Sequence, residues 1–180
     1  MRISKNETLV LVVDIQERLF GHIENHALLV KNMTILLQGL KHLDIPFIVN
    51  EQYKKGLGET IAEIEAIVSD DEHFEKTSFS CLQNLSTKET LLAYKKKYAI
   101  VMGVEAHVCV LQTCLDLLEY GIQPILIVDC IGSRKQRDCD VAVQRLAQAG
   151  VILATYESIL FELCESSREP AFKAISQLVK

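Results

Sequence analysis

Residues 98–120 read YAIVMGVEAHVCVLQTCLDLLEY. The apolar run 98–102 predicts a buried strand, and the spacing of apolar residues from Val108 onward predicts a helix. Cys109 would then lie in the first turn of a helix that follows directly from a strand. Because the first N–H groups of a helix are unpaired and the dipole is positive there, this position favours a thiolate over a thiol. Cys109 is therefore a candidate nucleophile.

The rest of the chain alternates between strands and helices. Solid apolar runs predict strands at 9–13, 47–49, 124–128 and 151–154, and a weaker signal predicts one at 73–80. Helical spacing predicts helices at 26–42, 61–68, 82–94, 138–149, 157–164 and 169–179. Strands that are apolar on both faces and alternate with helices specify a parallel sheet covered on both sides. Residues 1–180 are therefore expected to form a single three-layer α/β domain with six parallel strands.

Two local features refine this prediction. The polar, glycine-containing stretch 50–58 is predicted to be a loop at the carboxyl end of the strand at 47–49. Ser86 or Thr87 is expected to cap the start of the helix at 82–94.

Composition narrows the function classes. The chain has 180 residues, 49% of them apolar, and a net charge of −5, which fits a globular, enzyme-sized domain. Its one basic cluster is 95–97, which argues against a nucleic-acid surface. A polar N-terminus and the lack of a membrane-length apolar stretch predict a soluble cytoplasmic protein, with organellar residence left open. Six cysteines without a C-x-x-C pair argue against a disulfide framework or a zinc site.

Three residues far apart in the sequence are predicted to share one site. In doubly wound sheets, ligands bind at the carboxyl ends of the strands where the strand order reverses. If the first three strands wind one way and the last three the other, Asp14 and Cys109 become neighbours, and Lys76 can reach them from the third strand. Asp14 would act as general base and acid, and Lys76 would hold Asp14 and favour the thiolate. Cys109 would attack an electrophilic carbon while backbone N–H groups around it stabilise the oxyanion.

Each residue taken alone also has a structural explanation. An aspartate after a buried strand, as at Asp14 or Asp129, is often a turn residue or a helix cap. A single lysine such as Lys76 usually lies at the surface, and a cysteine on a helix usually packs in the core. The hypothesis of a catalytic site therefore depends on the three residues meeting.

The motifs that carry these residues resemble a known family, the isochorismatase-like cysteine hydrolases, which include nicotinamidases and N-carbamoylsarcosine amidases. The resemblance spans nearly the whole chain, through residues 14–20, 76–80, 103–110, 129–134 and 155–158. It implies a catalytic triad of Asp14, Lys76 and Cys109 and the strand order 3-2-1-4-5-6. It also implies a cis peptide bond between Val104 and Glu105, with the amides of Glu105 and Cys109 forming the oxyanion hole.

The departures from the family narrow the function further. Nicotinamidases bind a metal through an Asp-x-His pair after the second strand, where this chain has Glu51-Gln52-Tyr53. We therefore expect no catalytic metal and no cofactor. The overall pattern is most similar to the compact isochorismatase-domain hydrolases, whose substrates are mostly undefined.

The leading hypothesis is a metal-independent hydrolase that acts on a small amide, carbamoyl or related compound through a covalent intermediate on Cys109. Phe20, Tyr53 and Phe79 are candidates to line its pocket, although aromatic side chains also commonly pack in the core. The resemblance implies a homo-oligomer, and the apolar C-terminal segments fit either subunit contacts or packing within the chain. Three alternatives stay open: vinyl-ether hydrolysis by Asp14, a binding or scaffold protein without turnover, and a redox role for Cys109.

Overall fold

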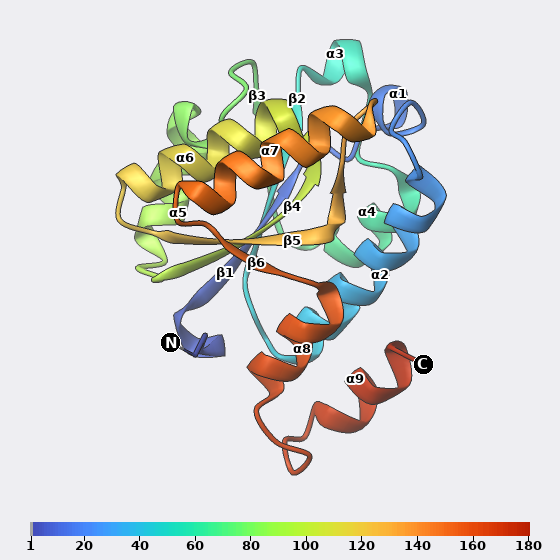
Figure 1. Cartoon of the computed structure of the whole chain (residues 1–180), viewed down its shortest axis with the longest axis vertical. Coiled ribbons are helices and arrows are strands. Elements are labelled where there is room, and N and C mark those ends of the chain that lie inside the picture. The colour runs from blue at the N-terminus through green and yellow to red at the C-terminus, as the bar shows by residue number, and fades with distance from the viewer. Residues whose placement is uncertain (1) are drawn as a thin grey trace.

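The computed structural model describes residues 2–180 and contains one six-stranded, all-parallel sheet in the order β3-β2-β1-β4-β5-β6 (Figure 1). The predicted fold class and strand order are confirmed. The strands are β1 (Thr8–Val13), β2 (Phe47–Gln52), β3 (Glu72–Lys76), β4 (Tyr98–Val104), β5 (Gln123–Gly132) and β6 (Ile152–Ala154). β1 and β4 lie at the centre, and every residue of both strands is buried, as continuous apolar runs require.

Helices cover both faces of this sheet (Figure 1). One face packs against α2 (His26–His42), α4 (Ala62–Val68), α8 (Tyr156–Cys164) and α9 (Phe172–Leu178). The other face packs against α5 (Leu85–Ala93), α6 (Leu111–Glu119) and α7 (Gln136–Gln148). The C-terminal helices pack within the chain, because α8 approaches α2 so closely that a Cβ on Gly39 would lie 2.5 Å from the Leu160 side chain.

Several element boundaries differ from the sequence prediction. The expected loop 50–58 contains the end of β2 and one helical turn, α3 (Lys54–Leu57). A second short helix, α1 (Glu17–Phe20), and two 3-10 turns, Lys5–Glu7 and Cys81–Gln83, were not predicted. Asn84, rather than Ser86 or Thr87, caps α5, because its side chain accepts the N–H of Thr87 at 3.0 Å.

The most consequential difference is the length of β5. This strand continues to Gly132, so Asp129 lies inside it and not at its end. The extension reaches β4, where Val104 pairs with Gly132 after a shift in register between Val101 and Gly103. The end of β5 therefore lies beside the segment that leads to Cys109.

The sheet reverses its winding between β1 and β4, where Val13 pairs with Gly103. Gly103 has a φ of 124°, and a Cβ at this position would lie 2.0 Å from the carbonyl oxygen of Val13. Only glycine permits this approach. The residues that follow each strand, Asp14 and Glu105, are thereby brought to the same edge of the sheet, as expected at a topological switch point.

Among residues 2–180, no helix is both long enough and apolar enough to cross a membrane.

Candidate active site

A buried ion pair joins the ends of β1 and β3. Lys76 Nζ lies 2.8 Å from Asp14 Oδ2, and both side chains are inaccessible to solvent. Lys76 is the last residue of β3, so its long side chain runs beneath the loop that follows and reaches the end of the neighbouring strands. An ion pair without access to water is costly to desolvate, and it persists in a fold where the geometry and further hydrogen bonds are good.

The lysine has those further hydrogen bonds. Nζ also donates to the Gln52 side-chain oxygen at 2.7 Å and to the Ser78 carbonyl at 3.2 Å, which completes its three donors. Gln52 is held in turn by the buried Gln16, which accepts the Gln52 N–H at 2.7 Å and donates to the Gln52 carbonyl at 3.0 Å. The sequence prediction did not assign roles to these glutamines. Each glutamine comes three residues after an apolar run, the first ending at Val13 and the second at Val49.

Cys109 lies in a π-helical turn, Ala106–Val110, that precedes α6. The expected first turn of an α-helix is therefore replaced by a wider turn at this position. The Glu105 carbonyl accepts the N–H groups of Val108 at 3.1 Å and Val110 at 3.2 Å, but not that of Cys109. The peptide bond between Val104 and Glu105 is cis, as the family resemblance implies.

Burial controls the protonation of Cys109. Cys109 is 6% exposed, and desolvation together with the adjacent Asp14 carboxylate raises the pKa of its thiol well above the usual range, while Lys76 opposes this rise. The expectation that the helix dipole favours a resting thiolate is therefore wrong. Burial also raises the pKa of Asp14, and Lys76 limits that rise by favouring the carboxylate. Burial thus favours the neutral forms of Cys109 and Asp14, and the ammonium of Lys76 favours the ionised forms of both.

Within the described part of the chain, the Asp14 carboxylate has one oxygen atom free to accept the proton of the Cys109 thiol. The Cys109 thiol lies close enough to the Asp14 carboxylate for the carboxylate to raise the thiol pKa. Asp14 Oδ2 accepts a hydrogen bond from Lys76, whereas Oδ1 is buried and has no hydrogen-bond partner among residues 2–180. This geometry lets Asp14 receive the proton of Cys109 when the sulfur forms a bond.

The three aromatic candidates lie in different environments. Tyr53 and Phe79 are 50% and 53% exposed, and both flank Lys76: the Tyr53 N–H donates to the Lys76 carbonyl at 2.9 Å, and Phe79 follows Ser78. Phe20 is buried in the core against the ring of His26. Tyr53 and Phe79 are thus exposed near Lys76, whereas Phe20 is not exposed.

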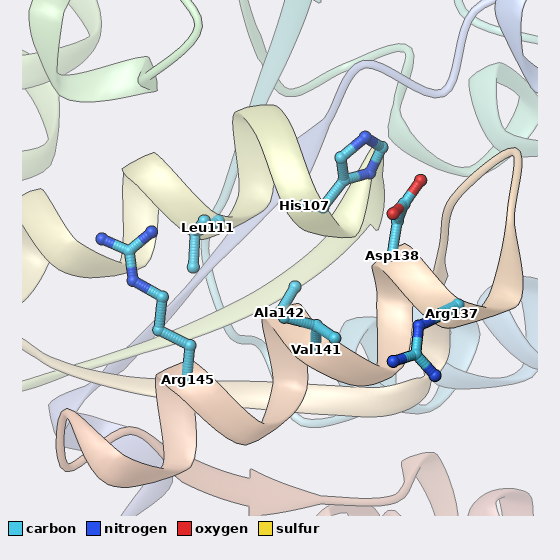
Figure 2. Close-up of a pocket in the computed structure, with 7 residues that line it drawn as sticks. All are labelled: His107, Leu111, Arg137, Asp138, Val141, Ala142 and Arg145. Atoms are coloured by element: carbon cyan, nitrogen blue, oxygen red, sulfur yellow. The ribbon is translucent and has the colours of Figure 1, made fainter.

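A surface hollow lies between the π-helical turn and α7. It has a volume of about 290 Å³ and is lined by His107, Leu111, Arg137, Asp138, Val141, Ala142 and Arg145 (Figure 2). Figure 2 shows the His107 ring leaving the turn towards α7, beside Asp138. His107 Nδ1 lies 2.9 Å from the hydroxyl of Ser133, a buried residue at the end of β5.

Within the described residues, no group of three or more His, Cys, Asp or Glu side chains is arranged to hold a metal ion. Near the end of β2, the Glu51 carboxylate accepts both the N–H and the hydroxyl of Thr60 at 2.9 Å and pairs with Lys54 at 3.0 Å. The absence of a catalytic metal stays a prediction.

Comparison with known proteins places this geometry in a family. The family profile of the isochorismatase domain matches residues 8–158. The chain belongs to the isochorismatase domain family. It is thus an isochorismatase-like hydrolase. Isochorismatase domain-containing protein 2 of Danio rerio is 35% identical over 178 residues, which cover 99% of this chain and 89% of the relative.

Solved structures agree with this assignment. A Caenorhabditis elegans protein described as MAR1 ribonuclease has 37% identity and a TM-score of 0.93, and the match covers 99% of this chain and 92% of that protein. The YcaC gene product of Escherichia coli, described as an octameric hydrolase of unknown specificity, has a TM-score of 0.94 at 24% identity and covers 99% and 90%. At that identity, the likeness to YcaC shows a common fold.

Proposed function

We propose that this isochorismatase-family protein is a metal-independent cysteine hydrolase that acts on a small amide, carbamoyl or related compound. The observation that carries the proposal is the solvent-inaccessible Asp14–Lys76 pair beside Cys109. A buried carboxylate and ammonium give the fold little net stability, so their presence next to a thiol fits a catalytic role.

Acylation begins with attack of Cys109 Sγ on the carbonyl carbon. As the C–S bond forms, the thiol proton moves to Asp14, and the carbonyl oxygen becomes an oxyanion. Collapse of this intermediate breaks the C–N bond, and the amine leaves with the proton from Asp14. The product of this half-reaction is a thioester on Cys109. Lys76 keeps Asp14 ionised before the attack and offsets the negative charge that passes between the carboxylate and the sulfur.

Deacylation reverses these roles with water as the nucleophile. The water oxygen attacks the thioester carbon while Asp14 accepts a proton from the water. The C–S bond then breaks, and the proton returns to the sulfur. The carboxylic or carbamic acid leaves, and the site holds a thiol and a carboxylate again.

The backbone amides of Glu105 and Cys109 are proposed to stabilise the oxyanion. Within residues 2–180, the Glu105 N–H has no backbone acceptor, and the Cys109 N–H is not directed at the Glu105 carbonyl that its neighbours use. Amide donors that are fixed before the reaction suit this role.

The site also suggests how a substrate enters. The exposed rings of Tyr53 and Phe79 on either side of Lys76 are proposed to form the rim that a small substrate crosses. We further propose that the protein forms a homo-oligomer, a proposal supported by the octamer described for YcaC. Light scattering that gives a monomer at micromolar concentration would contradict an obligate assembly.

A turnover screen tests the proposal. Small amides and carbamoyl compounds would be incubated with the wild type and with Cys109→Ala, and released amine or ammonia would be measured. Cys139→Ala is the matched control, because Cys139 has the same 6% exposure and lies on α7. We expect turnover that Cys109→Ala abolishes and Cys139→Ala retains. Turnover that survives in Cys109→Ala would contradict the covalent mechanism.

A second candidate is isochorismatase-type vinyl-ether hydrolysis, which the family match favours. Here Asp14 would donate a proton to the substrate, and the thiol would not be required. Hydrolysis of isochorismate that persists in Cys109→Ala and disappears in Asp14→Asn would favour this candidate. The same panel should include an RNA substrate, because the C. elegans relative is described as a ribonuclease. The net charge of −5 predicts no RNA cleavage.

A further inference from the structure

Two consecutive residues at the end of β5 are bonded to the turn that carries the nucleophile. The Ser133 hydroxyl lies 2.9 Å from His107 Nδ1. Glu105 Oε1 accepts the backbone N–H of Arg134 at 3.2 Å and its Nε–H at 3.0 Å. Glu105 and His107 lie four and two residues before Cys109. The segment Ser133–Arg134 therefore holds two side chains of the turn that leads to the nucleophile.

That segment is itself anchored. Gly132 pairs with Val104 in the sheet, directly before the turn begins. The Ser133 carbonyl accepts the N–H of Glu24 at 3.1 Å, and the Glu24 carboxylate accepts the N–H of Gln136 at 2.8 Å. The connection between β5 and α7 is thus fixed at the sheet and at the segment before α2, and it can act as a rigid support.

The turn has no equivalent support of its own. No side chain caps its start, and its first carbonyl, that of Glu105, is shared by two N–H groups. The amides proposed to form the oxyanion hole belong to Glu105 and Cys109. Their direction therefore depends on what holds the turn from outside.

We infer that Ser133 and Arg134 are positioning residues that aim the Glu105 and Cys109 amides at the developing oxyanion. This inference rests on the proposed cysteine mechanism. Arg134 acts through the Glu105 carboxylate, which is 9% exposed, and Ser133 acts through the His107 ring. Neither residue needs to touch the substrate.

Acylation and alkylation of Cys109 separate this role from general support of the fold. Acylation by p-nitrophenyl acetate builds an oxyanion, whereas alkylation by iodoacetamide displaces iodide and builds none. Displaced amides should therefore slow the first reaction and not the second. The two rates would be measured on the same protein, by the p-nitrophenol burst and by mass spectrometry of the Cys109 peptide.

The variants are Ser133→Ala and Arg134→Leu, with Ser133→Thr and Arg134→Lys as conservative replacements. Arg137→Leu is the matched control, because Arg137 is a neighbouring exposed arginine without an ion-pair partner among residues 2–180. We expect each of the first two variants to lower the acylation kcat on the order of tenfold or more, with KM and the alkylation rate within about twofold of wild type. The conservative variants should recover most of the loss, and Arg137→Leu should show none.

Two results would overturn the positioning role: acylation unchanged in both variants, or acylation and alkylation falling together. If buried Ser133→Ala fails to fold, the exposed Arg134→Leu decides between these outcomes, with its folding checked by thermal unfolding. A wild type that forms no acyl-Cys109 would instead overturn the proposed function, and the positioning role with it.

Discussion

Cys109 and Cys139 are equally exposed, at 6%, yet they occupy very different surroundings. Burial raises the pKa of Cys139 to about 11, and the nearby Asp140 carboxylate adds to the rise. Burial also raises the pKa of Cys109, and further than that of Cys139, and the adjacent Asp14 carboxylate adds to the rise. By the criterion of free thiolate alone, Cys139 would be the more reactive cysteine.

The difference lies in where the proton can go. In the proposed mechanism, Asp14 takes the proton from Cys109 and Lys76 stabilises the resulting thiolate, so the proton moves within the site and need not leave for solvent. Cys139 has no buried cation beside it among residues 2–180 and must lose its proton to water. A high thiol pKa is therefore compatible with a nucleophile when an acceptor and a cation share its pocket.

Lys76→Met should remove this advantage with the largest effect. The variant leaves the Asp14 carboxylate buried without its cation, which costs about 3–5 kcal/mol of unfolding free energy at neutral pH. Alkylation of Cys109 should fall to the level of Cys139 or below. Urea unfolding and site-resolved alkylation measure the two effects.

The pH dependence of that loss has a definite sign. Without Lys76, the pKa of Asp14 rises further above its unfolded value, so protonation on acidification favours the folded state. The deficit against wild type should shrink as pH falls from 7 towards 5. Asp14→Asn combined with Lys76→Met should recover about 1–3 kcal/mol relative to the single variant, because no charge stays buried. A deficit independent of pH and of residue 14 would show that the pair does not determine it.

Asp14→Asn should lower amide turnover much more than it lowers the reactivity of the Cys109 thiol. Loss of the general acid and base should lower amide turnover by about 10²–10⁴-fold. Removing the carboxylate also removes the internal proton acceptor of Cys109, so alkylation should slow at pH 7 and should rise with pH, while Lys76 beside the sulfur limits the loss by lowering the thiol pKa. Alkylation that stays as fast and as independent of pH as in the wild type would contradict the role of Asp14 as the proton acceptor.

Asp140→Asn should have the smallest effect, a modest rise in the alkylation rate of Cys139. Asp140 contributes to the raised pKa of Cys139, and its removal should speed alkylation there by about threefold or less, since an exposed charge is screened by solvent. Turnover should be unchanged. The measurement is peptide mapping after a timed iodoacetamide pulse.

The sequence predicted the parts of the site that depend on strand ends. Asp14 follows β1, and Lys76 is the last residue of β3. The order of strands and helices predicts a parallel sheet, and the carboxyl ends of its strands lie at one edge, where these two residues meet. The resemblance of the motifs to a family supplied the strand order and the cis bond at Val104–Glu105.

The parts that were missed depend on packing between distant segments. The pKa of Cys109 is raised because the folded chain buries its thiol. The local sequence, a cysteine at a predicted helix start, instead indicated a pKa lowered by the helix dipole. Gln16 and Gln52 meet across 36 residues, and a polar residue at a strand end does not name its partner. The extension of β5 to Gly132 was missed because Asp129 interrupts its apolar run.

Proton transfer from Cys109 to Asp14 can be tested through the alkylation rates of Cys109 and Cys139 in one wild-type sample between pH 6 and pH 9. We predict that Cys109 reacts faster at pH 7 and that its rate changes little with pH, because its proton moves to Asp14. The rate at Cys139 should rise about tenfold per pH unit, as for an isolated thiol below its pKa. A Cys109 rate that is slower than that of Cys139 and climbs with the same slope would contradict this transfer.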